Sequence, residues 1–170
     1  IIHDKILIVQ YDQKSNAKLY GFNLADGDLA WEANRGVISW SSPICVNTGN
    51  RYELVVANSK TVDAYDPRTG RQYWSIDCME GEMGPSPAFA AGMVYAANDN
   101  AVAVGIRLKG NSAEIAWRFD EELPDAASPL ATGKFVYLAT GYGIIICLDA
   151  QTGEMKWDAE FDAGFYASPV

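Results

Sequence analysis

The chain has 170 residues and a formal net charge of −9; 49% of its residues are hydrophobic and 21% are charged. This balance is typical of a packed globular protein and argues against a disordered chain, which combines low hydrophobicity with high charge. The acidic charge argues against a nucleic-acid partner, because phosphate backbones are bound by basic surfaces. No apolar run approaches the roughly 18 residues of a membrane helix, so we expect no membrane span.

Two markers recur along the chain in the same register. Four tryptophans, each closing a similar phrase, are separated by 43, 43 and 40 residues: Trp31, Trp74, Trp117 and Trp157. Ser-Pro pairs keep nearly the same spacing, at Ser42-Pro43, Ser86-Pro87, Ser128-Pro129 and Ser168-Pro169. Self-similarity at a fixed period of this size indicates a repeat architecture.

Short β-like runs lie between the markers, and no stretch of 11 or more residues shows a helical pattern. The first repeat is expected to begin at its second strand, 6–11, and the chain to end on the first strand of another blade. Four short strands in about 42 residues make one propeller blade. The prediction is an all-β fold of about four blades, each a four-stranded antiparallel sheet. The approximate repeats are 1–34, 35–77, 78–120 and 121–161, and a further blade starts in 162–170.

The repeated phrases predict tight turns followed by a large buried ring. In Asp66–Gly70 and Asp149–Gly153, the aspartate can accept hydrogen bonds from nearby amides and the glycine can supply a positive φ. The pair Asp26-Gly27 is interpreted as a shortened version of this turn. The four tryptophans are expected to lie against the neighbouring blade, since a single small sheet cannot bury both of its faces.

The phrase Asp-x-x-Thr-Gly-x-x-x-Trp with its Ser-Pro strand resembles the pyrroloquinoline-quinone-type β-propeller repeat, over about residues 5–170. The resemblance implies a seven- or eight-bladed propeller in a periplasmic or extracellular location. That family includes quinoprotein dehydrogenases. It also includes non-catalytic relatives such as the lipoprotein of the outer-membrane protein assembly machinery.

The non-catalytic branch fits the residues better. The dehydrogenases carry a quinone, a calcium ion, a catalytic aspartate and often a pair of adjacent cysteines. Cys45, Cys78 and Cys147 form no such pair, and no calcium ligand or catalytic base falls on a matching position. We therefore expect no catalytic residue, no metal and no cofactor, with pyrroloquinoline quinone and calcium kept as the alternative.

The loops that ring the propeller axis are the candidate binding face, because loops on a rigid scaffold commonly carry function. The candidate residues on these loops are Arg35, Trp40, Asn98, Asp99, Tyr142 and Tyr166. Exposed aromatic residues beside an arginine are typical of protein interfaces. The alternative is that Trp40 and Tyr166 plug the axis or pack on the next blade. The acidic loop residues predict a solvated rim, with calcium binding as the alternative: Glu80, Glu82, Glu121, Glu122 and Asp125.

The expected function is a protein-binding scaffold in the bacterial cell envelope. The alternatives are that the chain is part of a quinoprotein dehydrogenase, or that it is a propeller that binds glycans or small ligands outside the cell. The strand count leaves three assemblies open. The chain can be a fragment of a longer propeller, a four-bladed ring, or half of an eight-bladed ring that self-associates head to tail.

Overall fold

The computed structural model describes residues 1–13 and 15–170 and contains four antiparallel sheets. The first two sheets hold β1 (Ile2–His3), β2 (Ile6–Tyr11), β3 (Lys18–Asn23) and β4 (Leu29–Asn34), then β5 (Ile44–Asn47), β6 (Tyr52–Ala57), β7 (Thr61–Tyr65) and β8 (Gln72–Asp77). The last two hold β9 (Ala88–Ala90), β10 (Met93–Ala97), β11 (Ala103–Lys109) and β12 (Ser112–Phe119), then β13 (Leu130–Ala131), β14 (Phe135–Ala139), β15 (Ile144–Asp149) and β16 (Met155–Glu160). The described residues form no helix, so the all-β prediction is confirmed. Each sheet is one blade.

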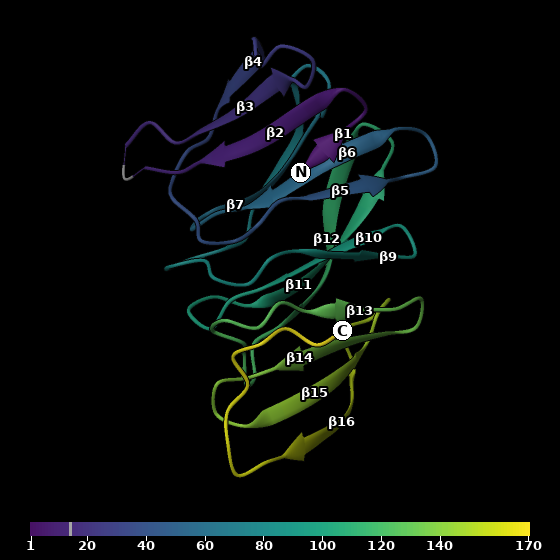
Figure 1. Cartoon of the computed structure of the whole chain (residues 1–170). Helices are drawn as coiled ribbons and strands as arrows, with labels where there is room; N and C mark the ends of the chain where they lie inside the picture. Colours follow the sequence, from purple (N-terminus) through teal and green to yellow (C-terminus); the bar gives the residue numbers. More distant parts are fainter. Residues whose placement is uncertain (14) are drawn as a thin grey trace.

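The blades follow one another in chain order and lie face to face, from the purple first blade to the yellow-green fourth (Figure 1). Within each blade the strands pair in sequence order. Between blades, first strands contact first strands, as β9 and β13 do, and last strands contact last strands, as β8 and β12 do. This is the radial arrangement of a propeller, with all four blades facing the same way around one axis.

The first blade is complete, which corrects the expectation that it begins at its second strand. Its first strand is the two-residue β1, in which Ile2 pairs with Leu7 and His3 with Ile6. The expected extra strand at the other end is absent from the described residues, since no strand follows β16. A two-residue strand shows no alternation of polar and apolar residues, so pattern reading missed it.

Each repeated tryptophan follows a β-bulge in the last strand of its blade. The register between third and fourth strands shifts at Gly21/Phe22 in the first blade, and the same shift recurs in the other three. A bulge re-aims the side chains that follow it. The residue paired with the tryptophan is small in every blade: Gly21, Ala64, Gly105 and Cys147. A Cβ on Gly21 would lie 2.3 Å from the Trp31 ring, so the ring occupies the space that a side chain would need.

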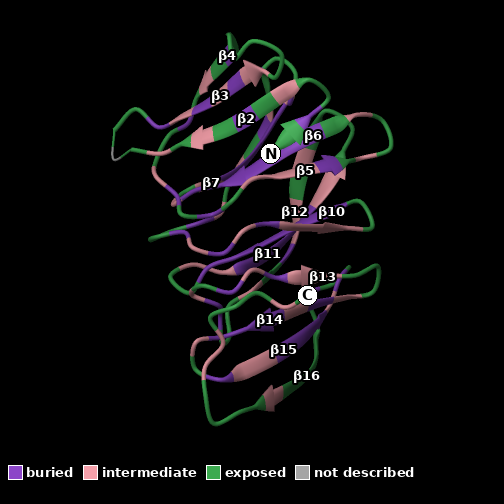
Figure 2. Cartoon of the chain, viewed as in Figure 1, coloured by how far each residue is buried: buried purple, intermediate pink, exposed green. Residues whose placement is uncertain are grey.

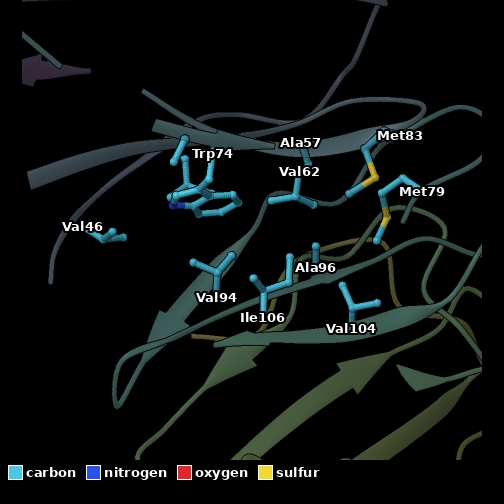
Figure 3. Packing of buried hydrophobic residues seen from close by; sticks show 12 residues of the cluster. Val46, Ala57, Val62, Trp74, Met79, Met83, Val94, Ala96, Val104 and Ile106 are labelled. Atoms are coloured by element: carbon cyan, nitrogen blue, oxygen red, sulfur yellow. The ribbon is translucent and has the colours of Figure 1, made fainter. Parts of the chain in front are cut away.

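The hydrophobic core consists of three clusters, one between each pair of consecutive blades. Figure 2 shows buried purple segments where the sheets face one another and green segments at the two outer sheets. Figure 3 shows the cluster between the second and third blades, where Trp74 and Val62 face Val94 and Ile106. Blade-to-blade packing therefore accounts for most of the apolar burial, as expected for repeat proteins.

The turns before Trp31, Trp74 and Trp157 share one hydrogen-bond pattern. In the second blade, the Gly70 N–H donates to the Asp66 carbonyl at 2.9 Å. In the first blade, the Gly27 N–H donates to the Asn23 carbonyl at the same distance. The interpretation of Asp26-Gly27 as a shortened turn was therefore wrong, because this turn has the full length.

The Ser-Pro serines form a ladder across the blades. The Ser42 N–H donates to Ser86 Oγ, the Ser86 N–H to Ser128 Oγ, and the Ser128 N–H to Ser168 Oγ, each at 2.9 Å. The hydroxyls of Ser86, Ser128 and Ser168 thus each accept a hydrogen bond from a backbone amide that has no strand partner. This role explains why serine recurs beside the proline.

No helix of the described chain is long and apolar enough to cross a membrane.

Candidate functional site

One end of the propeller carries most of the irregular chain, and we call it the loop face. Adjacent strands are antiparallel, so the loops between blades and the turns between second and third strands meet at this end. The loop face comprises Asp12 together with residues 35–43, 58–60, 78–87, 98–102, 120–129, 140–143 and 161–169.

Arg35 is buried at the base of the loop face, which corrects the expectation of an exposed arginine beside Trp40. Its side chain is 0% exposed and lies 2.8 Å from Asp12 Oδ1. Its Nη2 donates to the Ala57 carbonyl at 3.0 Å, which links the first blade to the second. Burial lowers the pKa of the Arg35 guanidinium, while the charge of Asp12 acts in the opposite direction. Arg35 is therefore a structural residue, and sequence reasoning missed Asp12, its partner from another loop.

Asp12 holds the loop that carries Trp40. Its Oδ2 accepts hydrogen bonds from the Ser39 N–H at 2.9 Å and from Gln10 Nε2 at 2.8 Å. The Trp40 N–H donates to the Met83 carbonyl at 2.9 Å, which ties this loop to the next one. A buried, hydrogen-bonded ion pair fixes the chain locally. The backbone on both sides of Trp40 is thus ordered before any partner binds.

The other loops are tied in the same manner. Asn98 is completely buried, contrary to its placement among the binding residues, and its Nδ2 donates to the Glu80 carbonyl at 2.7 Å. The Phe165 N–H donates to the Thr140 carbonyl at 2.9 Å. Asn98 lies at the end of a strand between two loops, where an amide side chain can replace missing ladder bonds.

Three aromatic side chains project from this fixed surface. Trp40 is 70% exposed, Tyr142 is 73% exposed and Tyr166 is 71% exposed. Tyr142 and Tyr166 come from loops that the Phe165–Thr140 hydrogen bond joins. Asp99 is also exposed, in the turn between β10 and β11. The alternative in which Trp40 and Tyr166 plug the axis or pack on a next blade stays a prediction, because their exposure is that of a four-bladed arc.

The loop face is acidic. Glu80, Glu82, Glu121 and Glu122 are exposed, and Asp125 is partly buried against Gly141. Within the described residues, no group of three or more His, Cys, Asp or Glu side chains lies close enough together to hold a metal ion. The carboxylates are spread around the rim rather than gathered at one point.

The three cysteines have no disulfide partner in the described structure. Burial raises the pKa of the Cys78 thiol to about 12, and it also raises the pKa of Cys45 and Cys147. A thiol with a raised pKa carries little of the nucleophilic thiolate at neutral pH. These side chains therefore act as small apolar residues in this structure.

A cavity of about 380 Å³ lies at the opposite end of the first two blades, beside Tyr52 and Tyr73. Its two arginines already have anionic partners. Arg68 Nε lies 2.9 Å from Asp4 Oδ2, and Arg51 Nη2 lies 2.8 Å from Glu53 Oε1. The cavity therefore offers little uncompensated charge, and the loop face remains the candidate site.

Comparison with known proteins agrees with this architecture. The profile of the family described as outer membrane protein assembly factor BamB matches residues 15–170. The serine/threonine-protein kinase AfsK of Streptomyces griseus is 26% identical over 166 residues, which cover 88% of this chain and 20% of that protein.

Two solved structures show the same fold. BamB from Moraxella catarrhalis superposes with a TM-score of 0.65 and 21% identity, over 94% of this chain and 49% of its own. A europium-containing methanol dehydrogenase superposes with a TM-score of 0.68 and 14% identity, over 92% of this chain and 42% of its own. The chain thus spans half or less of the length of these proteins. Since the family profile matches all but the first 14 residues, the chain belongs to the BamB family of propellers built from pyrroloquinoline-quinone-like repeats.

Proposed function

We propose that this chain is a non-catalytic propeller scaffold that binds a protein partner through its loop face, in the bacterial cell envelope. The observation that carries the proposal is the set of three aromatic side chains, each about 70% exposed, on loops whose backbones are hydrogen-bonded in place. The membership of the BamB family supports the envelope location and the protein-binding role. The buried tryptophans serve the scaffold by docking each blade on the next.

Pre-ordered aromatic side chains suit protein binding on energetic grounds. Tryptophan and tyrosine are enriched among the few residues that dominate binding energy at protein interfaces. Ordering a loop on binding costs free energy, and the fixed backbones around Trp40 and Tyr166 avoid much of this cost. Affinity then depends on the fit of the partner rather than on folding of the loops.

The acidic rim indicates the charge of the partner. Four exposed glutamates lie on the loop face that carries the aromatic residues, and the chain carries a net charge of −9. Complementary charge accelerates association and selects among partners, and added salt weakens this effect. The partner segment is therefore expected to be basic, and association should slow as ionic strength rises.

The test retains envelope proteins on the immobilised chain and compares variants. Trp40→Ala and Tyr166→Ala should lose the protein that the unaltered chain retains. Tyr52→Ala is the matched control, because Tyr52 is exposed at the opposite end of the second blade. Retention of the same protein by all variants, at unchanged salt dependence, would exclude the loop face.

A second candidate is a role in a quinoprotein dehydrogenase, which the similarity to the methanol dehydrogenase favours. Titration with pyrroloquinoline quinone and calcium, followed by calorimetry and absorbance, tests this role directly. Saturable binding with one quinone per chain would replace the scaffold proposal. A glycan array probed with the chain and with Trp40→Ala tests the ligand-binding alternative in the same way.

A further inference from the structure

A groove of about 180 Å³ lies between the third and fourth blades, where their last strands reach the loop face. Phe119 stands at the end of β12 on one side, and Glu160 stands at the end of β16 on the other. Both walls therefore belong to blades that the structure describes. The groove is separate from the cavity beside Tyr52 and Tyr73, which lies at the opposite end of the first two blades.

The inner surface of the groove is apolar. It is formed by four side chains from β12, β15 and β16: Phe119, Ile144, Ile146 and Met155. Ile146 belongs to the buried cluster between the third and fourth blades, and Phe119 and Ile144 pack against that cluster. Met155 is 43% exposed. The groove is thus an edge of the hydrophobic core that remains open to solvent.

The loop after the second blade fills its own interface with apolar side chains. Cys78 and Met79, four and five residues after the repeated tryptophan, pack into the cluster between the second and third blades. At the same distances after the tryptophan of the third blade stand Glu121 and Glu122, which are exposed and line the groove. Leu123 joins the buried cluster there but does not line the groove. The groove therefore lies where the loop provides carboxylates instead of apolar side chains.

The charge around the groove is negative and uncompensated. Four carboxylates line it: Glu121, Glu122, Asp158 and Glu160. Among the described residues, no ion pair includes any of the four. Arg118 of β12 pairs with Val104, which lies in the cluster between the second and third blades, so it belongs to the other face of its sheet. Lys156 of β16 is already paired with Glu154.

We propose that this groove receives an arginine side chain of the partner protein, an inference that rests on the proposed binding through the loop face. The aliphatic stem of that arginine covers Phe119 and Met155, and its guanidinium lies among the carboxylates. Long basic side chains commonly bury their stems on apolar surface while the charged head stays in polar surroundings. An arginine thus matches both the apolar and the acidic parts of the groove.

Charge complementarity favours this occupant over an apolar side chain. An apolar group would remove water from the carboxylates without replacing their hydrogen bonds, which costs free energy. A guanidinium replaces them with charge-assisted hydrogen bonds, and its five N–H donors can reach more than one carboxylate. No three carboxylates of the described chain lie close enough together to hold a metal ion, so their spacing suits a larger cation. Glu121 and Glu122 belong to the loop face, so the groove is part of the surface assigned to the partner.

The test uses two blocked tripeptides in low salt, glycine-arginine-glycine and the same peptide with citrulline, which has nearly the same shape without the charge. Nuclear magnetic resonance follows the labelled methyl groups of Ile144, Ile146 and Met155. We expect the arginine peptide to shift these signals saturably, and the citrulline peptide to bind at least about 10-fold more weakly. Equal binding of the two peptides, or no shift of these signals up to about 50 mM peptide, would overturn the proposal.

Paired charge changes locate the bound guanidinium. Glu121→Gln combined with Glu122→Gln keeps the side-chain size and should weaken binding of the arginine peptide by about 10-fold. The control combines Asp28→Asn with Glu114→Gln, which removes the same charge from exposed positions away from the loop face. It should change the affinity by less than about 2-fold. Equal weakening in both double variants would show that only the overall charge attracts the peptide, and this would refute the groove.

A second pair of variants tests whether the stem enters the groove. Glu121→Met and Glu121→Gln remove the same charge, but only methionine adds an apolar side chain that can occupy the groove, as Met79 occupies the other interface. The methionine variant should therefore bind the arginine peptide at least about 3-fold more weakly than the glutamine variant. Equal affinities would show that the stem stays outside.

The inference and the proposed function fail separately. Retention of an envelope protein by the Trp40→Ala variant tests the aromatic surface, whereas the peptide titration tests the groove. Retention that depends on Trp40 but not on Glu121 and Glu122 would refute the arginine site and leave the proposed function standing.

Discussion

The interface between the third and fourth blades and the interface between the second and third blades bury the same ring in different polar surroundings. Trp117 lies on Gly153, and its indole N–H donates to the Ala150 carbonyl at 3.0 Å. Trp74 faces the third blade, whose turn lacks the Asp-x-x-Thr-Gly phrase. Its indole N–H instead donates to Glu53 Oε2 of its own blade, at 2.8 Å.

The second interface replaces the missing turn with charged side chains. Arg51 pairs with the buried Glu53 and stacks on Tyr73, with the guanidinium carbon 3.6 Å from the ring centroid. Arg51 also donates to the Gly110 carbonyl at 3.0 Å and to the Asn111 side chain, both in the irregular turn. The position of the ring follows from the repeat, whereas the partner of its N–H depends on the particular turn that faces it.

Removal of a covered ring should have the largest effect on stability. Trp117→Ala is expected to lower the free energy of unfolding by about 3–5 kcal/mol, through lost burial and a cavity. Trp157→Ala should cost about 1–2 kcal/mol, because Trp157 is 47% exposed and no described blade covers it. Urea unfolding followed by far-ultraviolet circular dichroism measures both. Equal losses would show that the covering blade contributes little to the burial of the ring.

The second largest loss of stability is expected when the ion pair between Asp12 and Arg35 is broken. Asp12→Asn leaves the buried Arg35 without its hydrogen-bonded carboxylate, which is expected to cost about 3 kcal/mol. The control is Asp77→Asn, because Asp77 lies 3.6 Å from Lys60 in an exposed pair. That change should cost no more than about 0.5 kcal/mol. Similar midpoints for the two variants in urea would contradict a stabilising role for Asp12.

The repeat was readable from the sequence because its markers are local. Trp31 and Trp74 keep their spacing, and the runs between such markers are rich in β-branched and aromatic residues and bounded by turn residues, so the blades could be predicted. Arg35 and Asn98 could not be placed, because their burial depends on partners from other loops, Asp12 and the Glu80 carbonyl. Polar residues in loops are normally exposed, and only the meeting of two loops reverses that expectation.

The stability of the interface between the second and third blades should depend on the hydrogen-bond acceptor that Glu53 provides. Glu53→Ala removes the partner of the Trp74 indole and of Arg51, with an expected cost of about 2 kcal/mol. Glu53→Gln keeps an oxygen for the indole and loses only the charge, so it should cost about 1 kcal/mol. Urea midpoints of the two variants test this order. If glutamine proved as costly as alanine, the charge pairing with Arg51 would be the dominant contribution.

The smallest expected effect is on the pH dependence of stability, through the aspartates in the turns beneath the tryptophan rings. The hydrogen bond from the Gln151 N–H to Asp149 Oδ1, with that from Thr152, lowers the pKa of this carboxyl below its usual 3.8. A lowered pKa in the folded state means that the contribution is present above about pH 4 and is lost as the pH falls through the lower value.

Asp149→Asn keeps an oxygen acceptor and removes the titrating charge. The loss of thermal stability between about pH 5 and pH 2 should therefore be smaller in this variant than in the unaltered chain. Asp66 serves as the second arm of the test. Burial raises the pKa of Asp66, but hydrogen bonds from Arg68, Tyr73 and Thr69 lower it by a larger amount, so the net pKa is below the usual value. The double variant should flatten the acid profile more than either single variant. Parallel profiles for all four proteins would mean that these turns hold their geometry without the charge.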